Sequence, residues 1–381
     1  MKVLAVTGTR ADWGLLQPVL ALLRDDARFV LEILVTGQHL MPGSPSVAGI
    51  AAAGFTIAHR VDMRLSGGED DAALCAATGR ALTGVGEALA TARPDLMLVL
   101  GDRYEILGAV TAALLSKVPV AHIAGGDVTK GAFDDSIRHA ITKMSALHFT
   151  TCDVAAARVR QMGEAPEHVF VTGSPGIDQM LAVPRLERAA FFASVGLAPR
   201  DRNFLITLHP ATLSRGNASM TQAMLTALDS FPDAGLIFTG SNADPGAAEL
   251  DAMVQNYASC RESAVFHASL GSERYFSALE HCDLVLGNSS SGLYEAPSFG
   301  IPTINIGDRQ AGRVRATSVI DCPPQSDAIW AAIETALVGD WSGTVNPYGD
   351  GHAAPRILSH LAAMRDPAAL VRKTFRDMTH A

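Results

Sequence analysis

Residues 96–105 read LMLVLGDRYE, a run of five apolar residues followed by a glycine and then by Asp102, Arg103, Tyr104 and Glu105. An unbroken apolar run of this length is typical of a strand buried on both faces, as in a parallel sheet covered by helices. Charged side chains at the end of such a strand either point into a ligand crevice or cap the following helix. Because a cap needs only one of them, the three charges together favour a functional site.

The same pattern recurs along the whole chain, since apolar runs alternate with segments of helical periodicity. Such alternation predicts βα units and parallel sheets, that is, an α/β fold. We expect two Rossmann-like doubly wound domains, residues 1–180 and 181–354, facing a cleft. Residues 355–381 are expected to hold one helix, to about residue 379, that crosses back to the first domain. The expected strands are 3–6, 29–35, 96–100, 118–123, 169–171, 204–208, 235–238, 284–286 and 303–306.

The composition argues against several classes of protein. A net charge of −9 without a basic patch argues against a nucleic-acid partner. Five scattered cysteines with no CxxC pair argue against a disulfide framework or a zinc site. No apolar stretch reaches the roughly 18 residues of a membrane span. The N-terminal MKVLAVTG reads as a first strand and not as a signal peptide, so we expect a cytoplasmic protein.

A glycine turn follows the first expected strand in TGTRADWG at 7–14. Such a turn can bring backbone amides to a phosphate, and Arg10 would stand at the crevice edge, where a guanidinium can clamp a diphosphate. A turn with a solvated arginine is the alternative. The turn lacks GxGxxG, so the nicotinamide fingerprint is absent and no cofactor is expected.

Three aspartates follow the strand expected at 118–123, in HIAGGDVTKGAFDDSIRH. Asp127 lies in the loop, and Asp134 or Asp135 is expected to be the N-cap of the next helix. Carboxylates gathered at one crevice repel each other, which raises the pKa of at least one and suits acid–base chemistry.

In the second half, polar residues again follow the strands. His209 can donate to a phosphate oxygen, although a buried structural histidine fits the spacing almost as well. Asn242 can meet a base or a ribose, with an ordinary turn as the alternative. Arg309 opens a loop with three arginines in seven residues, which indicates contact with an anion or, alternatively, a solvated loop.

The segment LGNSSSGLYE at 286–295 carries the strongest single signal. Here a strand leads into three hydroxyls and a glycine, and a helix is expected to open. Ser289, Ser290 and the amides of that helix would form a phosphate cradle. Glu295, about one turn into the helix, could accept both hydroxyls of a ribose. A plain serine-rich cap is the alternative.

Seven motifs occur in order over nearly the whole chain: GTRADWG, GDRYE, HIAGGD, DDSIRHAITKMSALHF, GSNADPG, GNSSSGLYE and NIGDRQAGR. On these motifs the chain resembles the hydrolysing UDP-N-acetylglucosamine 2-epimerases of bacterial sialic-acid and related nonulosonic-acid synthesis. The resemblance implies a GT-B-like fold with the active site between the domains, and a reaction without metal or nicotinamide. A base removes the C2 proton, the nucleoside diphosphate leaves from C1 to give a glycal, and water then adds to release the C2-inverted sugar.

The resemblance also implies roles for individual residues. Asp102 and Asp134 match acid–base carboxylates of the family. The residues that match its nucleotide-diphosphate contacts are Arg10, Arg103, His209, Asn242, Ser289, Ser290, Glu295 and Arg309.

The chain departs from the family at Ala124, where some members carry a catalytic carboxylate and others a histidine. We hypothesise that Asp127, the nearest acid, or a bound water fills the gap. The departure leaves the sugar open. UDP-N-acetylglucosamine is the first candidate, and UDP- or GDP-linked 2,4-diacetamido-2,4,6-trideoxyglucose, as in legionaminic-acid synthesis, is the alternative with which an apolar Ala124 is compatible.

Other functions fit the motifs less well. A GT-B glycosyltransferase would use the serine-rich segment and Glu295, but it would not explain the carboxylates at Asp102, Asp127 and Asp134. Relatives that are non-hydrolysing epimerases lack the GDRYE and IRHAITKMS wording found here. An inactive sugar-nucleotide-binding protein is a third alternative. Because relatives form dimers or tetramers, we expect a homodimer or a homotetramer. The apolar helix around 137–147 could pack on a partner or lie in the core.

Overall fold

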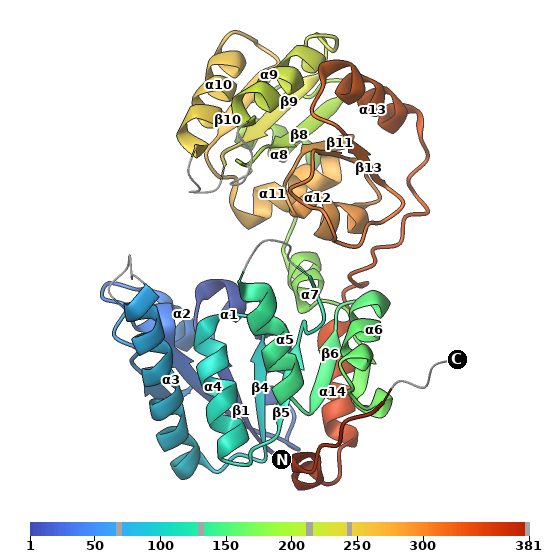
Figure 1. Ribbon diagram of the computed structural model, residues 1–381. Coiled ribbons are helices and arrows are strands. Elements are labelled where there is room, and N and C mark those ends of the chain that lie inside the picture. Colours follow the sequence, from blue (N-terminus) through green and yellow to red (C-terminus); the bar gives the residue numbers. More distant parts are fainter. Residues whose placement is uncertain (66–70, 129–132, 211–215, 242–245, 378–381) are drawn as a thin grey trace. The chain divides into compact units, whose positions relative to one another are not determined.

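The structure is a computed structural model that describes residues 1–65, 71–128, 133–210, 216–241 and 246–377. The chain divides into two compact units (Figure 1). The first comprises Met1–Gln179 and Tyr348–Ala381, and the second comprises Met180–Pro347. Within the described residues, no helix combines the length and the apolar character needed to cross a membrane.

The first unit is built on a seven-stranded parallel sheet with the strand order β3-β2-β1-β4-β5-β6-β7. The order runs down to β1 and then up from β4, so the topological switch point lies between these two strands. Ligands of doubly wound folds bind at the carboxyl ends of the strands at such a point. The strands are β1 (Lys2–Thr7), β2 (Val30–Thr36), β3 (Ile57–Val61), β4 (Leu96–Leu100), β5 (Val120–Ile123), β6 (Leu147–Thr150) and β7 (Val169–Val171).

Helices cover both faces of this sheet because successive strand residues point to opposite sides. Leu96 and Leu98 of β4 join a core with α1, α2 and α14, whereas Met97 and Val99 join a core with α3, α4 and α5. The helices of the unit are α1 (Arg10–Asp25), η1 (Gly37–Leu40), α2 (Ser46–Ala52), α3 (Asp71–Ala92), α4 (Tyr104–Leu115), α5 (Asp134–Met144), α6 (Asp153–Gln161), η2 (Pro166–His168), α7 (Pro175–Ala182, which ends in the second unit), α14 (Ala353–Ala363) and η4 (Pro367–Val371).

The C-terminal segment belongs to the first unit. Two α14 residues, Ile357 and Leu361, are buried in the same core as α1. The carboxylate of Asp178 accepts hydrogen bonds from the backbone amides that open α14, those of Ala353 at 3.0 Å and Ala354 at 2.7 Å. The expectation of one helix to about residue 379 is wrong. Helix α14 ends at Ala363, and a short 3₁₀ helix follows with a proline, which has no N–H to donate, in its first turn.

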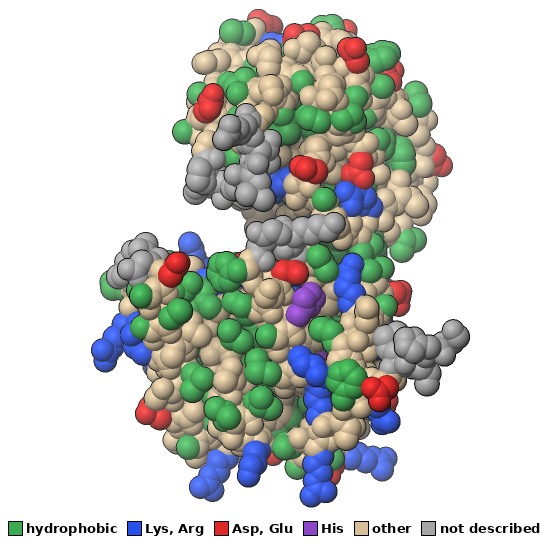
Figure 2. All heavy atoms as spheres, in the orientation of Figure 1, with side chains coloured by type: hydrophobic (Ala, Val, Ile, Leu, Met, Phe, Trp, Pro, Cys, Tyr) green, Lys and Arg blue, Asp and Glu red, His purple; other side chains and the backbone are tan. Residues whose placement is uncertain are grey.

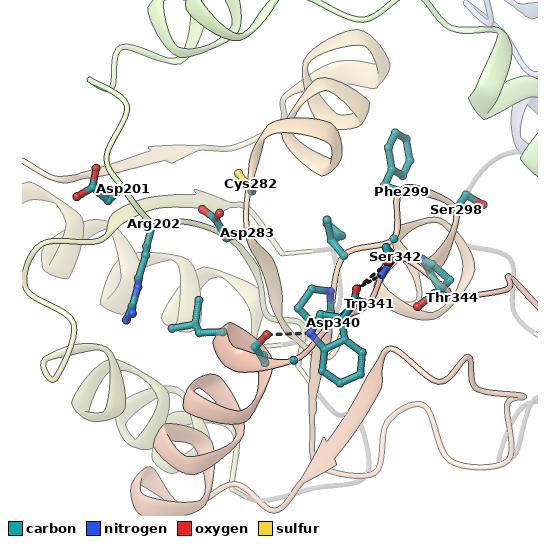
Figure 3. Close-up of a pocket in the computed structure, with 17 residues that line it drawn as sticks. Asp201, Arg202, Cys282, Asp283, Ser298, Phe299, Asp340, Trp341, Ser342 and Thr344 are labelled. Carbon is teal, nitrogen blue, oxygen red and sulfur yellow. Dashed lines mark hydrogen bonds between the residues drawn. The ribbon is translucent and has the colours of Figure 1, made fainter.

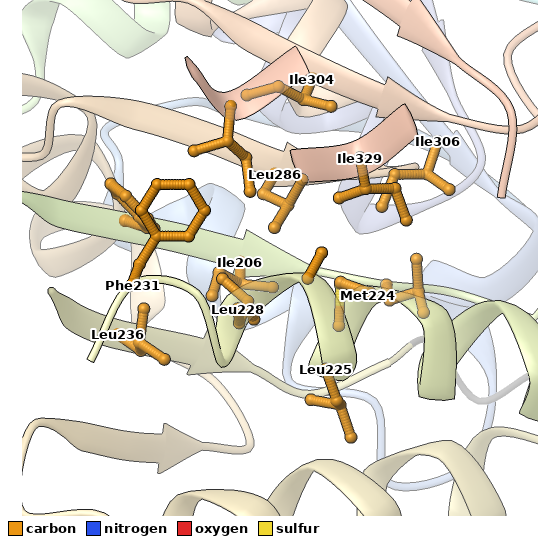
Figure 4. Close-up of a cluster of buried hydrophobic side chains, with 14 of the residues drawn as sticks. Ile206, Met224, Leu225, Leu228, Phe231, Leu236, Leu286, Ile304, Ile306 and Ile329 are labelled. Atoms are coloured by element: carbon orange, nitrogen blue, oxygen red, sulfur yellow. The ribbon is translucent and has the colours of Figure 1, made fainter. Parts of the chain in front are cut away.

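The second unit is built on a six-stranded parallel sheet with the order β10-β9-β8-β11-β12-β13, so its switch point lies between β8 and β11. One face packs on α9, α10 and α13, as Figure 4 shows for Leu228 and Ile329 against strand residues such as Leu286. The other face packs on α8 and α11 through Phe191 and Leu279. The elements are α8 (Arg188–Val195), β8 (Asn203–Thr207), α9 (Asn217–Leu228), β9 (Gly235–Thr239), α10 (Ala247–Ser259), β10 (Ala264–His267), α11 (Gly271–His281), β11 (Leu284–Gly287), α12 (Ser291–Tyr294), η3 (Ala296–Phe299), β12 (Thr303–Ile306), β13 (Val319–Cys322) and α13 (Ser326–Val338).

The predicted fold class, with two doubly wound α/β domains, is confirmed, and all nine predicted runs are strands. Four further strands, β3, β6, β10 and β13, are not predicted from the sequence. Three of these are edge strands with partly exposed residues, which interrupt the apolar run. The fourth, β6, begins three residues after α5 ends, so the helical pattern hides it. Helix α5 itself ends at Met144, and its Ile141 lies in the core of its own unit.

Candidate active site

The predicted site residues of the first unit follow the strands at its switch point. Arg10 comes three residues after β1, and Asp102 comes two residues after β4, on the neighbouring strand. The opposite edge is the basic one, where Lys2, Arg93 and Lys117 stand at or just before strand starts. Figure 2 shows lysine and arginine side chains gathered at the lower rim of this unit. The cations at the site edge are therefore few and individually placed.

The turn between β1 and α1 is held by a buried aspartate. Asp12 accepts hydrogen bonds from the backbone amides of Gly8 and Thr9, both at 2.8 Å, and Thr9 is the N-cap of α1 in a complete capping box. Arg10 is the first residue of the helix and is exposed. The fixed turn thus presents Arg10 to solvent at the carboxyl edge of the sheet, where it is free of the core.

The turn after β4 depends on a glycine and a buried glutamate. Gly101 has a φ of +84°, a left-handed conformation that favours glycine, and it carries the chain from the strand to Asp102. Arg103 donates to Glu105 through Nη2 at 2.9 Å and through Nε at 3.1 Å. Because Glu105 is fully buried, this pair anchors Arg103 at the mouth of the turn.

Helix α5 brings Arg138 to Asp102. The buried guanidinium of Arg138 donates through Nη2 to Oδ2 of Asp102 and through Nη1 to Oδ1 of Asp135 at 3.2 Å. Burial, and then the negative charge of Asp102, raise the pKa of Asp134. The structure thus brings two of the predicted catalytic carboxylates, Asp102 and Asp134, into electrostatic contact.

The predicted cap of α5 is wrong, because neither aspartate is the N-cap. Phe133 takes that position with helical backbone angles and without a side-chain cap, and Asp134 and Asp135 both lie in the first turn. Acidic side chains there still interact favourably with the partial positive charge of the helix terminus.

Asp127 is engaged away from Asp102. Its Oδ1 accepts a hydrogen bond from Thr151 Oγ1 at 2.8 Å, and its carbonyl accepts one from Arg138 Nη1 at 2.8 Å. Ala124, where relatives carry a carboxylate, is half-buried and has a left-handed φ of +63°. Asp127 is thus linked to the Asp102 group through its backbone and Arg138.

The switch point of the second unit is organised by Asn288. Gly287 has a φ of +139°, and a Cβ there would lie 1.9 Å from the carbonyl oxygen of Thr207, so only glycine fits. The buried side chain of Asn288 accepts from the amide of His209 at 2.7 Å and donates to the carbonyl of His209 at 2.9 Å. The Asn288 carbonyl accepts from Arg309 Nη1 at 3.3 Å. His209 and Arg309 are therefore brought together around one residue.

The serine-rich segment differs from the expectation, because the helix that follows it is one turn long. Ser289 Oγ accepts from the Ser291 amide at 3.4 Å, and Ser290 is the N-cap of α12. The helix changes to 3₁₀ geometry at Ala296, since Pro297 cannot continue α-helical hydrogen bonding. The cradle therefore rests on hydroxyls and on the amides of a single turn.

Glu295 ends this turn in a largely enclosed position. Burial raises the pKa of its carboxyl group, while a hydrogen bond with Ser291 acts in the opposite direction. Its Oε2 atom has no hydrogen-bond partner among the described residues. Asn242, the remaining predicted residue of this unit, lies outside the described residues.

Comparison with known proteins places the chain in a family. The sequence model of the UDP-N-acetylglucosamine 2-epimerase family matches residues 21–362. The chain belongs to this family. It is 36% identical over 324 residues to the GDP/UDP-N,N'-diacetylbacillosamine 2-epimerase (hydrolyzing) of Campylobacter jejuni, covering 84% of each protein. It is 32% identical over 357 residues to the UDP-N,N'-diacetylbacillosamine 2-epimerase (hydrolyzing) of Legionella pneumophila, covering 93% of this chain and 94% of that protein.

The present chain also shares its fold with a protein of known crystal structure. The UDP-GlcNAc 2-epimerase of Neisseria meningitidis, in a crystal structure with bound UDP-GlcNAc, matches with a TM-score of 0.76 over 95% of this chain and 100% of that one. Its sequence identity is 19%, so the likeness concerns the fold alone.

Two residues of the candidate site in this epimerase-family chain, Arg138 and Asn288, are not predicted from the sequence, and Glu105 is predicted only as one of three charges at a strand end. A signal for Arg138 was present, because it lies four residues after Asp134 and so shares a face of the same helix. Glu105 lies in the GDRYE motif, and Asn288 lies in the GNSSSGLYE motif. Their roles are internal hydrogen bonds, which spacing does not reveal.

A cavity of about 830 Å³ in the second unit lies away from these residues. Figure 3 shows Arg202, Asp283 and Trp341 on its wall. Arg202 directly precedes β8, and Asp283 directly precedes β11. The cavity therefore opens at the amino ends of the strands, and none of the predicted site residues lines it. Over the described ranges, no group of three or more His, Cys, Asp or Glu side chains is arranged to hold a metal ion.

Proposed function

We propose that the chain is a hydrolysing 2-epimerase of a UDP-activated N-acetylhexosamine, with UDP-N-acetylglucosamine as the first candidate substrate. The products would be UDP and the free C2-inverted sugar. The carrying observation is the contrast between two carboxylates at one sheet edge: Asp102 is paired with Arg138, whereas burial and the charge of Asp102 raise the pKa of Asp134. The raised pKa of Asp134 suits a general acid, and the contact with Arg138 holds the Asp102 carboxylate in place as a base.

In this proposal Asp102 is the ionised base that removes the proton from C2. The electrons of that C–H bond form the C1–C2 double bond as the C1–O bond to the diphosphate breaks, which gives the glycal. Asp134 in its acid form then gives its proton to C2 from the opposite face while a water oxygen bonds to C1. The proton that this water loses returns to the Asp134 carboxylate, and the proton taken up by Asp102 is released to solvent. The C2 centre is thereby inverted and the sugar is released. Each acid–base residue contributes roughly 10²–10⁴ in rate.

The C2 proton is poorly acidic, so the elimination needs strong stabilisation of the leaving diphosphate. We assign this to Arg10 and Arg103 of the first unit and to polar groups at the second switch point. Those groups are Ser289, Ser290, His209 and Arg309. Glu295 would accept from ribose hydroxyls, which its unpaired Oε2 supports. A contact from Asn242 stays a prediction.

A second candidate substrate is a UDP- or GDP-linked 2,4-diacetamido-2,4,6-trideoxyglucose. The Campylobacter and Legionella relatives are named for diacetylbacillosamine substrates, and they are 36% and 32% identical to this chain. A relative from Neisseria meningitidis, named UDP-N-acetylglucosamine 2-epimerase, is 29% identical. The apolar Ala124 also suits a deoxy sugar. A nonulosonic-acid pathway, a cytoplasmic location and a homodimeric or homotetrameric state remain predictions.

Proton NMR in D₂O tests the proposal. The protein is incubated without added metal or nicotinamide, separately with UDP-N-acetylglucosamine and with the UDP- and GDP-linked diacetamido sugars. We expect free nucleoside diphosphate and a C2-inverted sugar carrying deuterium at C2 in one tube, which names the substrate. Release of diphosphate without deuterium at C2 would overturn the mechanism, and binding without turnover in all three would favour a transferase or a binding protein.

The role of Asp127 is tested in the same assay. If it replaces the carboxylate missing at Ala124, Asp127→Asn should lower turnover by about 10²-fold or more. Normal turnover of that variant would leave a bound water as the replacement.

A further inference from the structure

Arg138 contacts three separate segments of the first unit with one guanidinium. It donates to the Asp102 carboxylate after β4, to the Asp127 carbonyl after β5 at 2.8 Å, and to Asp135 on its own helix at 3.2 Å. Only 7% of the residue is exposed. A buried guanidinium with donors committed to a carboxylate and a backbone carbonyl is held in one orientation, and it holds its partners in turn.

A second, uncharged route fixes the same helix against the same turn. His122 on β5 is fully buried, and burial lowers its pKa to about 3, so the ring is neutral. Its Nε2 lies 2.8 Å from the carbonyl oxygen of Gly101, which can only accept, so Nε2 carries the proton. The hydroxyl of Thr142, one helical turn after Arg138, shares its single proton between Nδ1 at 3.2 Å and the Arg138 carbonyl at 2.9 Å. Gly101 and α5 are thus tied through β5.

We infer that Arg138 is the positioning residue of the reaction, in that its guanidinium aims the Asp102 carboxylate and keeps it available as the base. The inference rests on the proposed function and goes beyond it by assigning the residue that makes Asp102, and not Asp134, the base. The two routes from α5 to the turn after β4 have different roles. His122 and Thr142 fix the backbone of the turn after β4, and Arg138 orients the Asp102 side chain and supplies its counter-charge.

The charged groups around Asp102 define what the loss of Arg138 would do. The carboxyl groups of Asp134 and Asp135 lie on α5, Asp127 lies in the loop after β5, and Arg103 is the adjacent residue but is bound to Glu105. The buried His122 beneath the turn is neutral. Without the Arg138 guanidinium, Asp102 would face the carboxyl groups of α5 with no paired cation.

A direct contact of Arg138 with the substrate diphosphate is the competing role, and the two roles predict different kinetics. A positioning residue acts through Asp102, so its loss lowers kcat and moves the acidic limb of the pH profile while UDP affinity stays constant. A diphosphate ligand contributes to ground-state binding, so its loss raises KM and weakens UDP binding.

The test compares Arg138→Gln and Arg138→Lys with Arg158→Gln as the matched control. Arg158 on α6 donates to the neighbouring carbonyl of Gly126 at 3.1 Å and, among the described residues, bonds to no carboxylate, so its variant removes a similar loop anchor. We expect Arg138→Gln to lower kcat by about 10² or more and to move the acidic limb up by at least about one pH unit. Arg138→Lys should recover part of both, and Arg158→Gln should change neither.

An acidic limb that stays fixed in Arg138→Gln, or a loss that appears in UDP affinity, would overturn the inference. So would an equal shift of the limb in Arg158→Gln. If Arg138→Gln does not fold, the test uses Arg138→Lys, and the direction in which the acidic limb of its pH profile moves decides the outcome. Wild-type protein without turnover in the D₂O assay would instead refute the proposed function, so the two failures are distinguishable.

Discussion

At the residue scale, the candidate chemistry depends on two aspartates, Asp102 and Asp134, that have different neighbours. Asp102 is bound by a guanidinium, whereas Asp134 lies half-buried on α5 with a raised pKa. The guanidinium holds the Asp102 carboxylate in place, and burial disfavours the charged form of Asp134. The same amino acid is thereby suited to two roles at one sheet edge.

Replacing Asp102 with Asn tests its assignment as the base. We expect kcat to fall by about 10²–10⁴, because a positioned base is lost while the side chain keeps its size. Steady-state kinetics should be paired with a thermal melt to show that the fold is retained. Asp153→Asn on the exposed first turn of α6 is the control, and it should keep wild-type turnover. Equal activity of Asp102→Asn and wild type would remove Asp102 from the mechanism.

Asp134 gives a pH-dependent prediction about stability. Its folded-state pKa lies above that of an unfolded aspartate, about 3.9. Below that value both states are protonated, and as the pH rises through the folded pKa the ionised group destabilises the folded state. Asp134→Asn should therefore raise Tm at pH 7, and this gain should fade toward pH 3. A Tm difference that is the same at both pH values would contradict the raised pKa.

At the element scale, the helix that carries Arg138 and Asp134 is held from its far end by the C-terminal segment. Lys373 donates to the carbonyls of Lys143 and Ser145 at the end of α5, at 2.5 Å and 2.6 Å, and pairs with buried Glu164 at 2.6 Å. Cations at a helix C-terminus satisfy its free carbonyls and its partial negative charge. The tail thus acts as a cap for α5 across more than 200 residues of sequence.

We expect Lys373→Met to lower the free energy of unfolding by about 1–3 kcal/mol, since it removes the donor to two carbonyls at the end of α5 and one of the three partners of Glu164, which keeps Lys143 and His148. The paired Glu164 has its pKa lowered to about 2, so its contribution is present above the unfolded pKa and is lost as the pH falls through about 2. The neighbouring exposed variant Arg372→Met is the control. Urea unfolding curves that coincide for the two variants would show that the cap contributes nothing.

At the scale of the whole molecule, both units contribute proposed diphosphate contacts, whereas the proposed catalytic carboxylates all belong to the first unit. The carboxylates follow strands of the first sheet, whereas the serine-rich segment, His209 and Arg309 follow strands of the second. Asp102, His209 and the serine-rich segment follow switch-point strands, whereas Asp134 and Arg309 follow the next strands, β5 and β12. Binding and chemistry should therefore be separable by mutation.

We expect UDP at a hundredfold its Kd to stabilise the protein by about 2.7 kcal/mol, because it binds only the folded state. Glu295→Gln should weaken this stabilisation by removing the ribose acceptor, whereas Asp102→Asn should keep it. Thermal melts with UDP, and with ADP as the unmatched nucleotide, measure the effect. Loss of UDP stabilisation in Asp102→Asn but not in Glu295→Gln would reverse the assignment of the two units.

The sequence by itself determined the parallel α/β architecture, because strands buried on both faces must be continuously apolar and their period is visible in the chain. It also placed Asp102, Ser289 and Glu295 at strand ends, since a switch point gathers the residues that follow its strands. Tertiary structure alone decided that Arg138 pairs with Asp102, that Asn288 joins His209 and Arg309, and that Lys373 caps α5. These contacts join residues distant in sequence, and a hydrogen bond depends on distance and direction in space, which the periodicity of a chain does not encode.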